Sequence, residues 1–192
     1  MIDSLEMIRG TIEKEEAYKI FNQSPHNYGV VTLHRPSNVD DPDSLKSICS
    51  LLGDLAEKTP LIFPVHPRTR KNLKDWDMLD VLEKSENIHI PEPLSYIPFL
   101  NLVFNCKFVI TDSGGIQEET SYLNIPCFTL RPNTERPITI KQGTNHLCDL
   151  KNIRQTLKDV LASQPLTMNP IKFWDGKTAA RVIHSIKLFL HA

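Results

Sequence analysis

Two polar segments carry the side chains best suited to chemistry, and each directly follows an apolar run. The first is His34-Arg35-Pro36-Ser37-Asn38, and the second is Asp112-Ser113-Gly114-Gly115-Ile116-Gln117-Glu118-Glu119. A histidine can gain or lose a proton near neutral pH, and an arginine is a permanent cation. His34 and Arg35 could therefore bind an anion and handle a proton beside it. For His34, the alternative is a hydrogen-bonded histidine with a purely structural role.

The second segment is the sharper signal, because Ser113-Gly114-Gly115 links an apolar run to a predicted helix. Two glycines let the backbone approach a ligand closely, and free N–H groups at the start of a helix attract phosphate. The alternative is a plain strand-to-helix turn, in which Glu118 and Glu119 only favour the helix dipole. Glu119 could instead accept hydrogen bonds from both hydroxyls of a ribose, as acidic residues do in dinucleotide folds.

Further candidates follow other apolar runs. Arg131 and Arg136 could contact phosphate in a bidentate manner. The alternative for either arginine is a salt bridge within the loop, and the adjacent Glu135 favours it for Arg136. His66 is a weaker candidate.

Tyr96 and Phe99 could stack on a base. The alternative for these two aromatic side chains is core packing, because apolar residues surround them in the sequence.

The apolar runs predict six strands and the charged periodic stretches predict helices. Asp41 followed by Pro42 predicts the start of the second helix. Residues 131–145 form the longest irregular segment, which is a common place for function. The predicted strands are 28–33, 61–65, 88–90, 107–111, 126–130 and a short one at 146–148. The predicted helices are 2–20, 42–55, 68–84, 96–105, 116–123, 151–163 and 177–190.

Strands alternate with helices along the whole chain, which predicts a Rossmann-like α/β fold with a doubly wound parallel sheet. In such a sheet, ligands bind beyond the carboxyl ends of the strands, where the strand order switches. For the order 3-2-1-4-5-6, this crevice lies between the first and fourth strands. We therefore expect the segments at His34 and Asp112 to lie side by side.

Composition excludes several classes of protein. The chain has 192 residues, with 22 Lys+Arg against 23 Asp+Glu and a net charge of −1. That length suits one domain, or one large domain with an added arm. The charge balance argues against nucleic-acid binding by general electrostatics. No apolar run approaches the length of about 18 residues that a membrane helix needs. The start of the sequence is acidic and amphipathic, which does not suit a signal peptide, so we expect a cytoplasmic protein.

The sequence predicts no metal site. Its 4 cysteines include no C-x-x-C pair, and its 7 histidines show no H-x-x-x-H or H-E-x-x-H spacing. We expect reduced, buried thiols. No G-x-G-x-x-G occurs, and Gly176-Lys177-Thr178 lacks the first glycine of a phosphate-binding P-loop.

Taken together, the motifs resemble UDP-N-acetylglucosamine 2-epimerases over nearly the whole chain. The resemblance departs from many members at Pro36-Ser37 and Pro132-Asn133, which indicates a subgroup. The segments that match, in order, are Thr32–Arg35, Pro64–Pro67, Pro93-Leu94 with Tyr96 and Phe99, Thr111–Glu119, Leu130-Arg131, Thr134–Pro137 and Gly143–Asn145.

The resemblance implies half of a two-domain GT-B architecture, in which the nucleotide sugar binds between two Rossmann-like domains. This chain resembles the second domain. We expect residues 1–24 to be a linker or helical arm and residues 25–176 to be the UDP-binding domain. The helix at 177–192 would pack towards an N-terminal Rossmann-like domain that this chain lacks. A homo-oligomer is possible, and no metal or redox cofactor is implied.

The family interconverts UDP-GlcNAc and UDP-ManNAc by removing the C2 proton, eliminating UDP and adding it back. Its catalytic carboxylates lie largely in the first domain, so we expect the isolated chain to be inactive. Three alternatives stay open: a hydrolysing 2-epimerase, half of a GT-B glycosyltransferase, or a stand-alone nucleotide-sugar binding module. By resemblance, UDP and UDP-N-acetylhexosamine are the ligands, and His34 is the catalytic residue that faces the diphosphate and the sugar. The implied substrate-binding residues are Ser113, Gly114, Gly115 and Arg131 for the diphosphate, Glu119 for the ribose, Phe99 for the uracil, and Arg35, Pro93 and Leu94.

Overall fold

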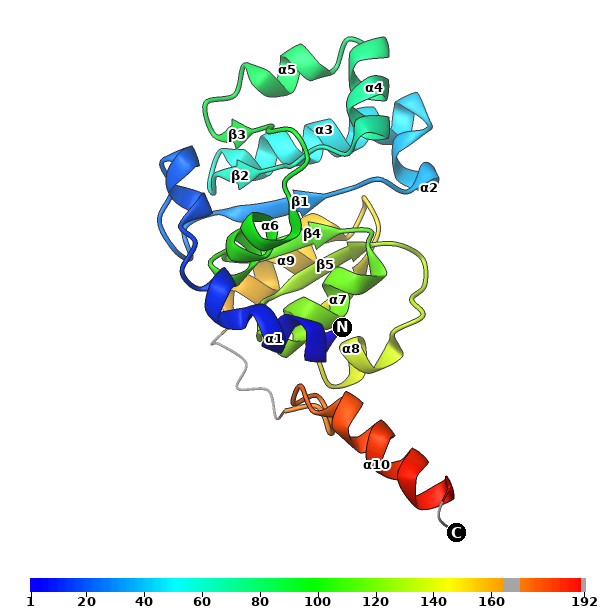
Figure 1. Cartoon of the computed structure of the whole chain (residues 1–192). Coiled ribbons are helices and arrows are strands. Elements are labelled where there is room, and N and C mark those ends of the chain that lie inside the picture. The colour runs from blue at the N-terminus through cyan, green and yellow to red at the C-terminus, as the bar shows by residue number, and fades with distance from the viewer. Residues whose placement is uncertain (164–169, 191–192) are drawn as a thin grey trace.

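A computed structural model describes residues 1–163 and 170–190 of the chain and contains one six-stranded parallel sheet (Figure 1). The strand order is β3-β2-β1-β4-β5-β6, so the predicted fold class and strand order are confirmed. The strands are β1 (Gly29–Thr32), β2 (Leu61–Ile62), β3 (Ile88–His89), β4 (Phe108–Thr111), β5 (Cys127–Leu130) and β6 (Asn145–Cys148).

Helices cover both faces of the sheet, as expected for right-handed crossovers between parallel strands. Figure 1 shows α1, α6 and α7 on the side nearer the viewer. The helices are α1 (Ile2–Ile12), the 3₁₀ helix η1 (Ala17–Phe21), α2 (Pro36–Val39), α3 (Pro42–Ala56), α4 (Pro67–Asp75), α5 (Leu79–Glu83), α6 (Tyr96–Phe104), α7 (Gly114–Tyr122), α8 (Pro137–Lys141), α9 (Ile153–Ala162) and α10 (Thr178–Leu190).

Several predicted elements differ from the observed ones. The helix predicted over 68–84 is broken into α4 and α5, because Asp77 adopts a left-handed conformation with φ 54°. The strand predicted over 61–65 is shorter, because Pro64 has no N–H to donate. Phe63 N still donates to His89 O at 2.8 Å, so the chain runs on beside β3.

Three further predictions need correction. The stretch predicted as one helical segment over 2–20 divides into α1 and η1. Residues 131–145 are not wholly irregular, because α8 begins at Pro137 within them. Helix α7 begins at Gly114, two residues before the predicted start at Ile116, so both glycines belong to its first turn.

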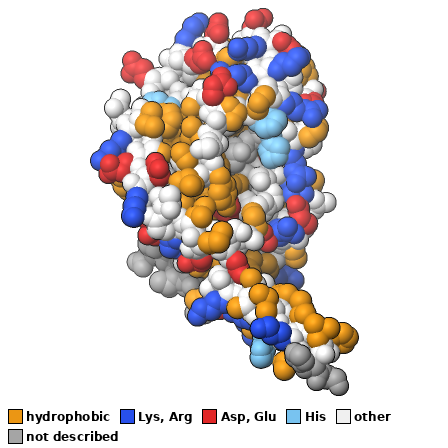
Figure 2. Space-filling view, in the orientation of Figure 1, with side chains coloured by type: hydrophobic (Ala, Val, Ile, Leu, Met, Phe, Trp, Pro, Cys, Tyr) orange, Lys and Arg blue, Asp and Glu red, His pale blue; other side chains and the backbone are white. Residues whose placement is uncertain are grey.

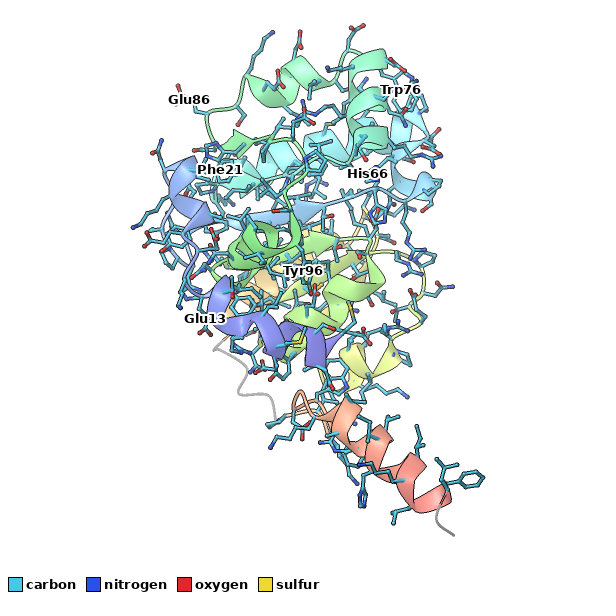
Figure 3. The ribbon with its side chains drawn as sticks, in the orientation of Figure 1. Glu13, Phe21, His66, Trp76, Glu86 and Tyr96 are labelled. Carbon is cyan, nitrogen blue, oxygen red and sulfur yellow. The ribbon has the colours of Figure 1, made fainter. Side chains whose placement is uncertain are left out.

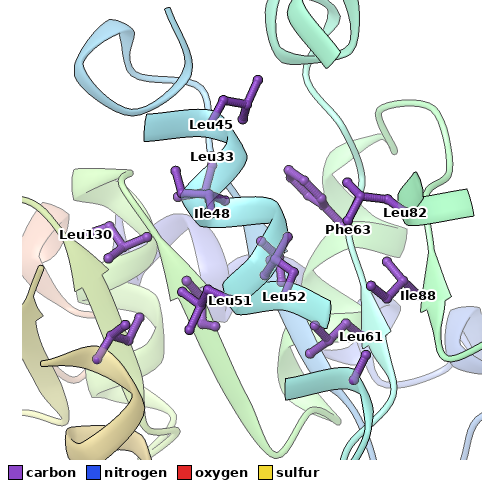
Figure 4. Packing of buried hydrophobic residues seen from close by; sticks show 14 of the residues in the cluster. Leu33, Leu45, Ile48, Leu51, Leu52, Leu61, Phe63, Leu82, Ile88 and Leu130 are labelled. Carbon is purple, nitrogen blue, oxygen red and sulfur yellow. The ribbon is translucent and has the colours of Figure 1, made fainter. Parts of the chain in front are cut away.

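The core has one part on each face of the sheet. Alternate residues of β1 point to opposite sides, so Val31 belongs to the part under α3 and Val30 to the part under α6. Helix α3 is positioned by its cap, since Asp41 Oδ2 accepts a hydrogen bond from Ser44 N at 2.8 Å. Figure 4 shows the α3 side, where labelled residues include Leu45, Ile48, Leu51, Leu52, Leu61, Phe63 and Ile88. This packing fixes the strand ends that carry the candidate site.

All four cysteines are free thiols, of which Cys106, Cys127 and Cys148 are buried and Cys49 is half-buried. Within residues 1–163 and 170–190, no three His, Cys, Asp or Glu side chains form a group that could hold a metal ion. None of the helices in this described part is long and apolar enough to cross a membrane.

Helix α10 projects away from the sheet and its covering helices (Figure 1). None of its described residues is buried, and Figure 2 shows apolar side chains gathered along it. Its start is tied to α1, because Ala179 N donates to Asp3 Oδ2 at 2.8 Å. The C-terminal segment predicted at 177–192 is therefore helical over 178–190. Residues 191–192, like 164–169 of the predicted UDP-binding domain, lie outside the described residues.

We expect the apolar face of α10 to cause self-association of the purified chain. Ile183 and Ile186 are 54% and 51% exposed and lie three residues apart on the helix, so they share one face. The double variant Ile183→Glu, Ile186→Glu should shift the chain towards the 21.9 kDa monomer in sedimentation and lower the binding of a hydrophobic dye several-fold. Val81→Glu on α5, also at an exposed site, is the control and should change neither measurement. A wild-type chain that stays monomeric and binds no dye would contradict this expectation.

Candidate functional site

The buried carboxylate of Asp112 joins the two polar segments. Strands β1 and β4 pair in parallel with Thr32 opposite Thr111, so both segments leave the sheet at the same edge. Asp112 is 0% exposed and directly follows β4. Its carboxylate accepts hydrogen bonds from the backbone N–H groups of His34 at 3.0 Å and Arg35 at 2.9 Å. The predicted proximity of the two strand ends is therefore confirmed.

Asp112 also orients side chains. Nδ1 of His34 lies 3.0 Å from Oδ1 of Asp112, and Asn38 Nδ2 donates to Oδ2 at 3.0 Å. Burial by itself raises the pKa of the Asp112 carboxyl, but these hydrogen bonds outweigh burial and hold its pKa below the ordinary value. An ionised carboxylate only accepts, so Nδ1 of His34 carries the proton. The other ring nitrogen, Nε2, is then the one that can contact a ligand.

His66 lies beside His34, with ring centroids 5.6 Å apart. It precedes α4, and its Nδ1 accepts a hydrogen bond from Arg68 N at 3.2 Å. The weaker candidate from the second strand thus joins the same edge of the sheet. Figure 3 labels His66 near α2 and α4, and Figure 2 shows exposed histidine side chains at this edge.

The glycine turn begins α7, with Ser113 as the residue before the first helical turn. A Cβ atom on Gly114 would lie 2.5 Å from Oε1 of Glu135, and one on Gly115 would lie 2.5 Å from Cε of Met1. Both positions therefore have close neighbours that a side chain would displace. The turn presents backbone N–H groups at the start of a helix, as an anion site requires.

Two arginines flank this turn, and Glu135 connects them. Arg131 Nη1 lies 2.8 Å from Glu135 Oε2, and Arg35 Nη2 lies 3.7 Å from Glu135 Oε1. Arg136 forms a salt bridge, as the alternative interpretation held, but its partner is Glu118 at 3.0 Å. The predicted pairing of Arg136 with its neighbour Glu135 is wrong, because Glu135 faces Arg131 and Arg35 instead.

Glu119 is 2% exposed on α7, and its Oε1 accepts a hydrogen bond from the Tyr96 hydroxyl at 2.8 Å. Burial raises the pKa of the Glu119 carboxyl, although the Tyr96 hydroxyl lowers it in part. Burial and the Glu119 charge both raise the pKa of Tyr96, which keeps its proton. Figure 3 labels Tyr96 on α6 in front of the sheet. The structure thus brings together the Glu119 carboxylate and the Tyr96 ring, which are two separate candidates in the sequence.

The remaining sequence candidates lie on or before α6. Phe99 and Leu94 are half-buried and pack against the core, while Pro93 is exposed. For Phe99, core packing is thus part of its role. Its role towards uracil stays a prediction, as do the roles of Pro93 and Leu94.

A buried amide network was missed from the sequence. Gln117 is fully buried, and its Oε1 accepts hydrogen bonds from Thr134 Oγ1 at 2.6 Å and Asn145 Nδ2 at 3.0 Å. Its Nε2 donates to Ser113 O at 3.2 Å. Gln117 therefore ties the glycine turn to the loop that carries Glu135. The only sequence signal was that these residues fall within the matched motifs.

The sheet and its carboxyl-edge site define one half of the GT-B class of two-domain folds. An *Escherichia coli* heptosyltransferase structure shares the fold, with a TM-score of 0.51 at 14% identity over 75% of this chain and 47% of that chain. The family model described as UDP-N-acetylglucosamine 2-epimerase matches residues 1–187. The chain therefore belongs to the UDP-N-acetylglucosamine 2-epimerase family.

Individual relatives agree with this assignment. The UDP-N-acetylglucosamine 2-epimerase of *Methanocaldococcus jannaschii* is 38% identical over 178 residues, which cover 89% of this chain and 48% of the relative. That of *Methanococcus maripaludis* is 37% identical over 91% of this chain and 49% of the relative. The *M. jannaschii* crystal structure in complex with UDP-GlcNAc and UDP has a TM-score of 0.84 at 35% identity and covers 97% of this chain and 52% of that chain. The chain thus spans about half the length of the curated relatives it matches.

Proposed function

We propose that this chain forms the UDP-binding half of a UDP-N-acetylglucosamine 2-epimerase. The observation that carries the proposal is the convergence of His34, Arg35, Arg131 and the Gly114 turn at the carboxyl edge of β1, β4 and β5. Cations and helix N–H groups at one point suit a diphosphate. The structure of the Methanocaldococcus jannaschii relative was solved with UDP-GlcNAc and UDP, which supports the same ligands here.

In the proposed reaction, the C2–H bond and the bond from C1 to the UDP oxygen both break. A double bond forms between C1 and C2, and UDP leaves with the electron pair of the broken C–O bond. UDP adds back after a proton returns to the opposite face of C2. By resemblance, carboxylates of another domain move the proton. This chain would stabilise the negative charge that develops on the departing UDP.

Each site residue has a distinct task in this proposal. Arg35, Arg131 and the N–H groups at Gly114 contact the diphosphate. Nε2 of His34, held by the hydrogen bond from Nδ1 to Asp112, contacts the diphosphate or the sugar. The aromatic and carboxylate groups on α6 and α7 bind the nucleoside.

The domain arrangement is part of the proposal. Residues 25–176 would bind UDP, and residues 1–24 and 177–192 would contact the domain that closes the cleft. The exposed apolar side chains of α10 support this assignment. Since the chain spans about half of its relatives, we expect it to bind UDP without converting UDP-GlcNAc on its own.

Calorimetric titration of the chain tests the proposal. We expect a dissociation constant for UDP of about 1 μM to 1 mM, since in this proposal residues 1–192 supply the contacts from one side of the cleft. Pyrophosphate should bind more weakly, because it lacks the nucleoside. Gly114→Val should weaken both ligands, because its side chain enters the diphosphate site. Gly53→Val on α3, where a Cβ meets nothing within 4 Å, is the matched control. Unchanged UDP binding in Gly114→Val, with an intact circular dichroism spectrum, would refute the site.

Activity is tested by mixing the chain with the first domain of the *M. jannaschii* relative. Formation of UDP-ManNAc supports the proposal, release of free N-acetylmannosamine indicates the hydrolysing reaction, and hexosyl transfer indicates a glycosyltransferase. Turnover by the chain alone that disappears in His34→Ala would contradict the expected inactivity. Turnover that persists in His34→Ala reveals a contaminant.

A further inference from the structure

The carboxylate of Glu135 lies within the proposed diphosphate site. One oxygen lies 2.8 Å from Arg131 Nη1, and the other lies 3.7 Å from Arg35 Nη2. The second oxygen also lies against the glycine turn, 2.5 Å from where a Cβ on Gly114 would be. A single acidic group thus contacts both arginines and the turn that we assign to the diphosphate.

The backbone on both sides of Glu135 is fixed. Thr134 Oγ1 donates to Gln117 Oε1 at 2.6 Å and accepts from Arg136 N at 2.9 Å. Arg136 Nε lies 3.0 Å from Glu118 Oε1. The loop is therefore anchored to Gln117 and Glu118 of α7, and it presents the Glu135 side chain to the arginines from a defined position.

The Glu135 side chain itself can move away from the two arginines. It is 44% exposed, whereas Arg131 is only 11% exposed. A rotation about its side-chain bonds would move the carboxylate into water without any change in the loop. Its own backbone N–H and Arg131 hold the pKa of the Glu135 carboxyl below its ordinary value, so it is ionised at neutral pH.

We propose that Glu135 is an internal competitor for the diphosphate site, which UDP must displace from Arg131, Arg35 and the Gly114 turn in order to bind. This inference rests on the proposed function. A carboxylate and a phosphate make the same charge-assisted hydrogen bonds to arginine. The diphosphate carries more negative charge than one carboxylate, so it displaces Glu135. When UDP dissociates, the Glu135 carboxylate pairs with the two arginines again. The residue thereby limits the affinity for UDP and favours its release.

The test compares UDP, pyrophosphate and uridine binding to the wild-type chain and to Glu135→Gln by calorimetry at fixed salt. Gln keeps the size of the side chain and removes its charge. We expect Glu135→Gln to bind UDP and pyrophosphate about 3- to 10-fold more tightly. Uridine affinity should stay the same, since uridine has no phosphate. The affinity of Glu135→Gln for UDP should also fall more steeply with added salt, because one more positive charge is uncompensated.

Glu83→Gln is the matched control. It makes the same substitution at an exposed glutamate that pairs with Arg70, on a helix far along the sheet. UDP affinity should stay within twofold of the wild-type value. Glu135→Ala provides a second variant and should tighten UDP binding in the same direction.

The outcomes separate the two proposals. A wild-type chain that binds neither UDP nor pyrophosphate refutes the proposed function and this inference with it. If the wild-type chain binds UDP but Glu135→Gln binds it equally or more weakly, the competitor role is wrong and the proposed function stands. Weaker binding would mean that Glu135 holds the arginines in place for the ligand.

Discussion

Replacing Asp112 with alanine is expected to lower the free energy of unfolding by about 3 kcal/mol and to abolish measurable UDP binding. Asp112 is 0% exposed and accepts hydrogen bonds from His34, Arg35 and Asn38. Without its carboxylate, the half-buried N–H groups of His34 and Arg35 lose their partner, which costs about 1–3 kcal/mol for each group left unpaired. Asn38 keeps its hydrogen bond to Leu130 O. His34 also loses the contact that orients its ring. Urea unfolding followed by circular dichroism measures the stability, and calorimetry measures UDP binding.

Asp112→Ala should also make the free energy of unfolding depend less on pH in the acid range. The folded-state pKa of Asp112 lies below its unfolded value, so its contribution is fully present above about pH 4 and is lost as the pH falls through the folded pKa. Asp112→Ala should remove this part of the acid dependence. Asp54→Asn, at an exposed ion pair with Arg154, is the control and should cost less than about 1 kcal/mol. If Asp112→Ala is as stable as Asp54→Asn, the hydrogen bonds that the Asp112 carboxylate accepts from the other polar segment do not stabilise the fold.

The position of the site could be predicted from the sequence because it depends on the fold class. Apolar runs alternating with helices predict a parallel sheet, and the sheet places polar strand ends at one edge. The segments at His34 and Asp112 are therefore expected side by side, and in the structure Nδ1 of His34 lies 3.0 Å from Oδ1 of Asp112. The contacts of Asp112 could not be predicted, because they depend on the register of Thr32 opposite Thr111. Local spacing carries no information about a partner nearly 80 residues away in the chain.

The loop between β5 and β6 shows a second reason why some contacts of the site could not be predicted from the sequence. Glu135 and Arg136 are adjacent in sequence, which favours a salt bridge between them. In the structure, the hydrogen bond from Thr134 to the buried Gln117 fixes the loop. The side chains of Glu135 and Arg136 therefore contact different partners. Glu135 contacts Arg131, and Arg136 contacts Glu118. A buried amide decided this geometry, and no pattern of charges in the sequence indicates where a buried amide will bond.

Replacing Glu119 with glutamine is expected to weaken UDP binding while leaving the chain at least as stable as the wild type. A carboxylate can accept hydrogen bonds from both ribose hydroxyls, whereas glutamine offers one acceptor and no charge. Losing a hydrogen bond to a charged group costs about 1.5–3 kcal/mol, so UDP affinity should fall about 10- to 100-fold. Pyrophosphate affinity should not change, because pyrophosphate has no ribose. Tyr96→Phe removes only the hydrogen bond to Oε1 and should give a smaller loss.

The stability of Glu119→Gln follows from the opposite sign of the pKa shift. The folded-state pKa of Glu119 lies above its unfolded value, so the ionised group destabilises the fold at neutral pH, and this cost disappears as the pH falls below the unfolded pKa of about 4.3. Glutamine still accepts the Tyr96 hydrogen bond without the buried charge. Thermal unfolding at pH 7 should therefore show an equal or higher midpoint for Glu119→Gln, with the difference vanishing in acid. A lower midpoint together with weaker pyrophosphate binding would mean that Glu119 supports the glycine turn structurally and does not select the nucleoside.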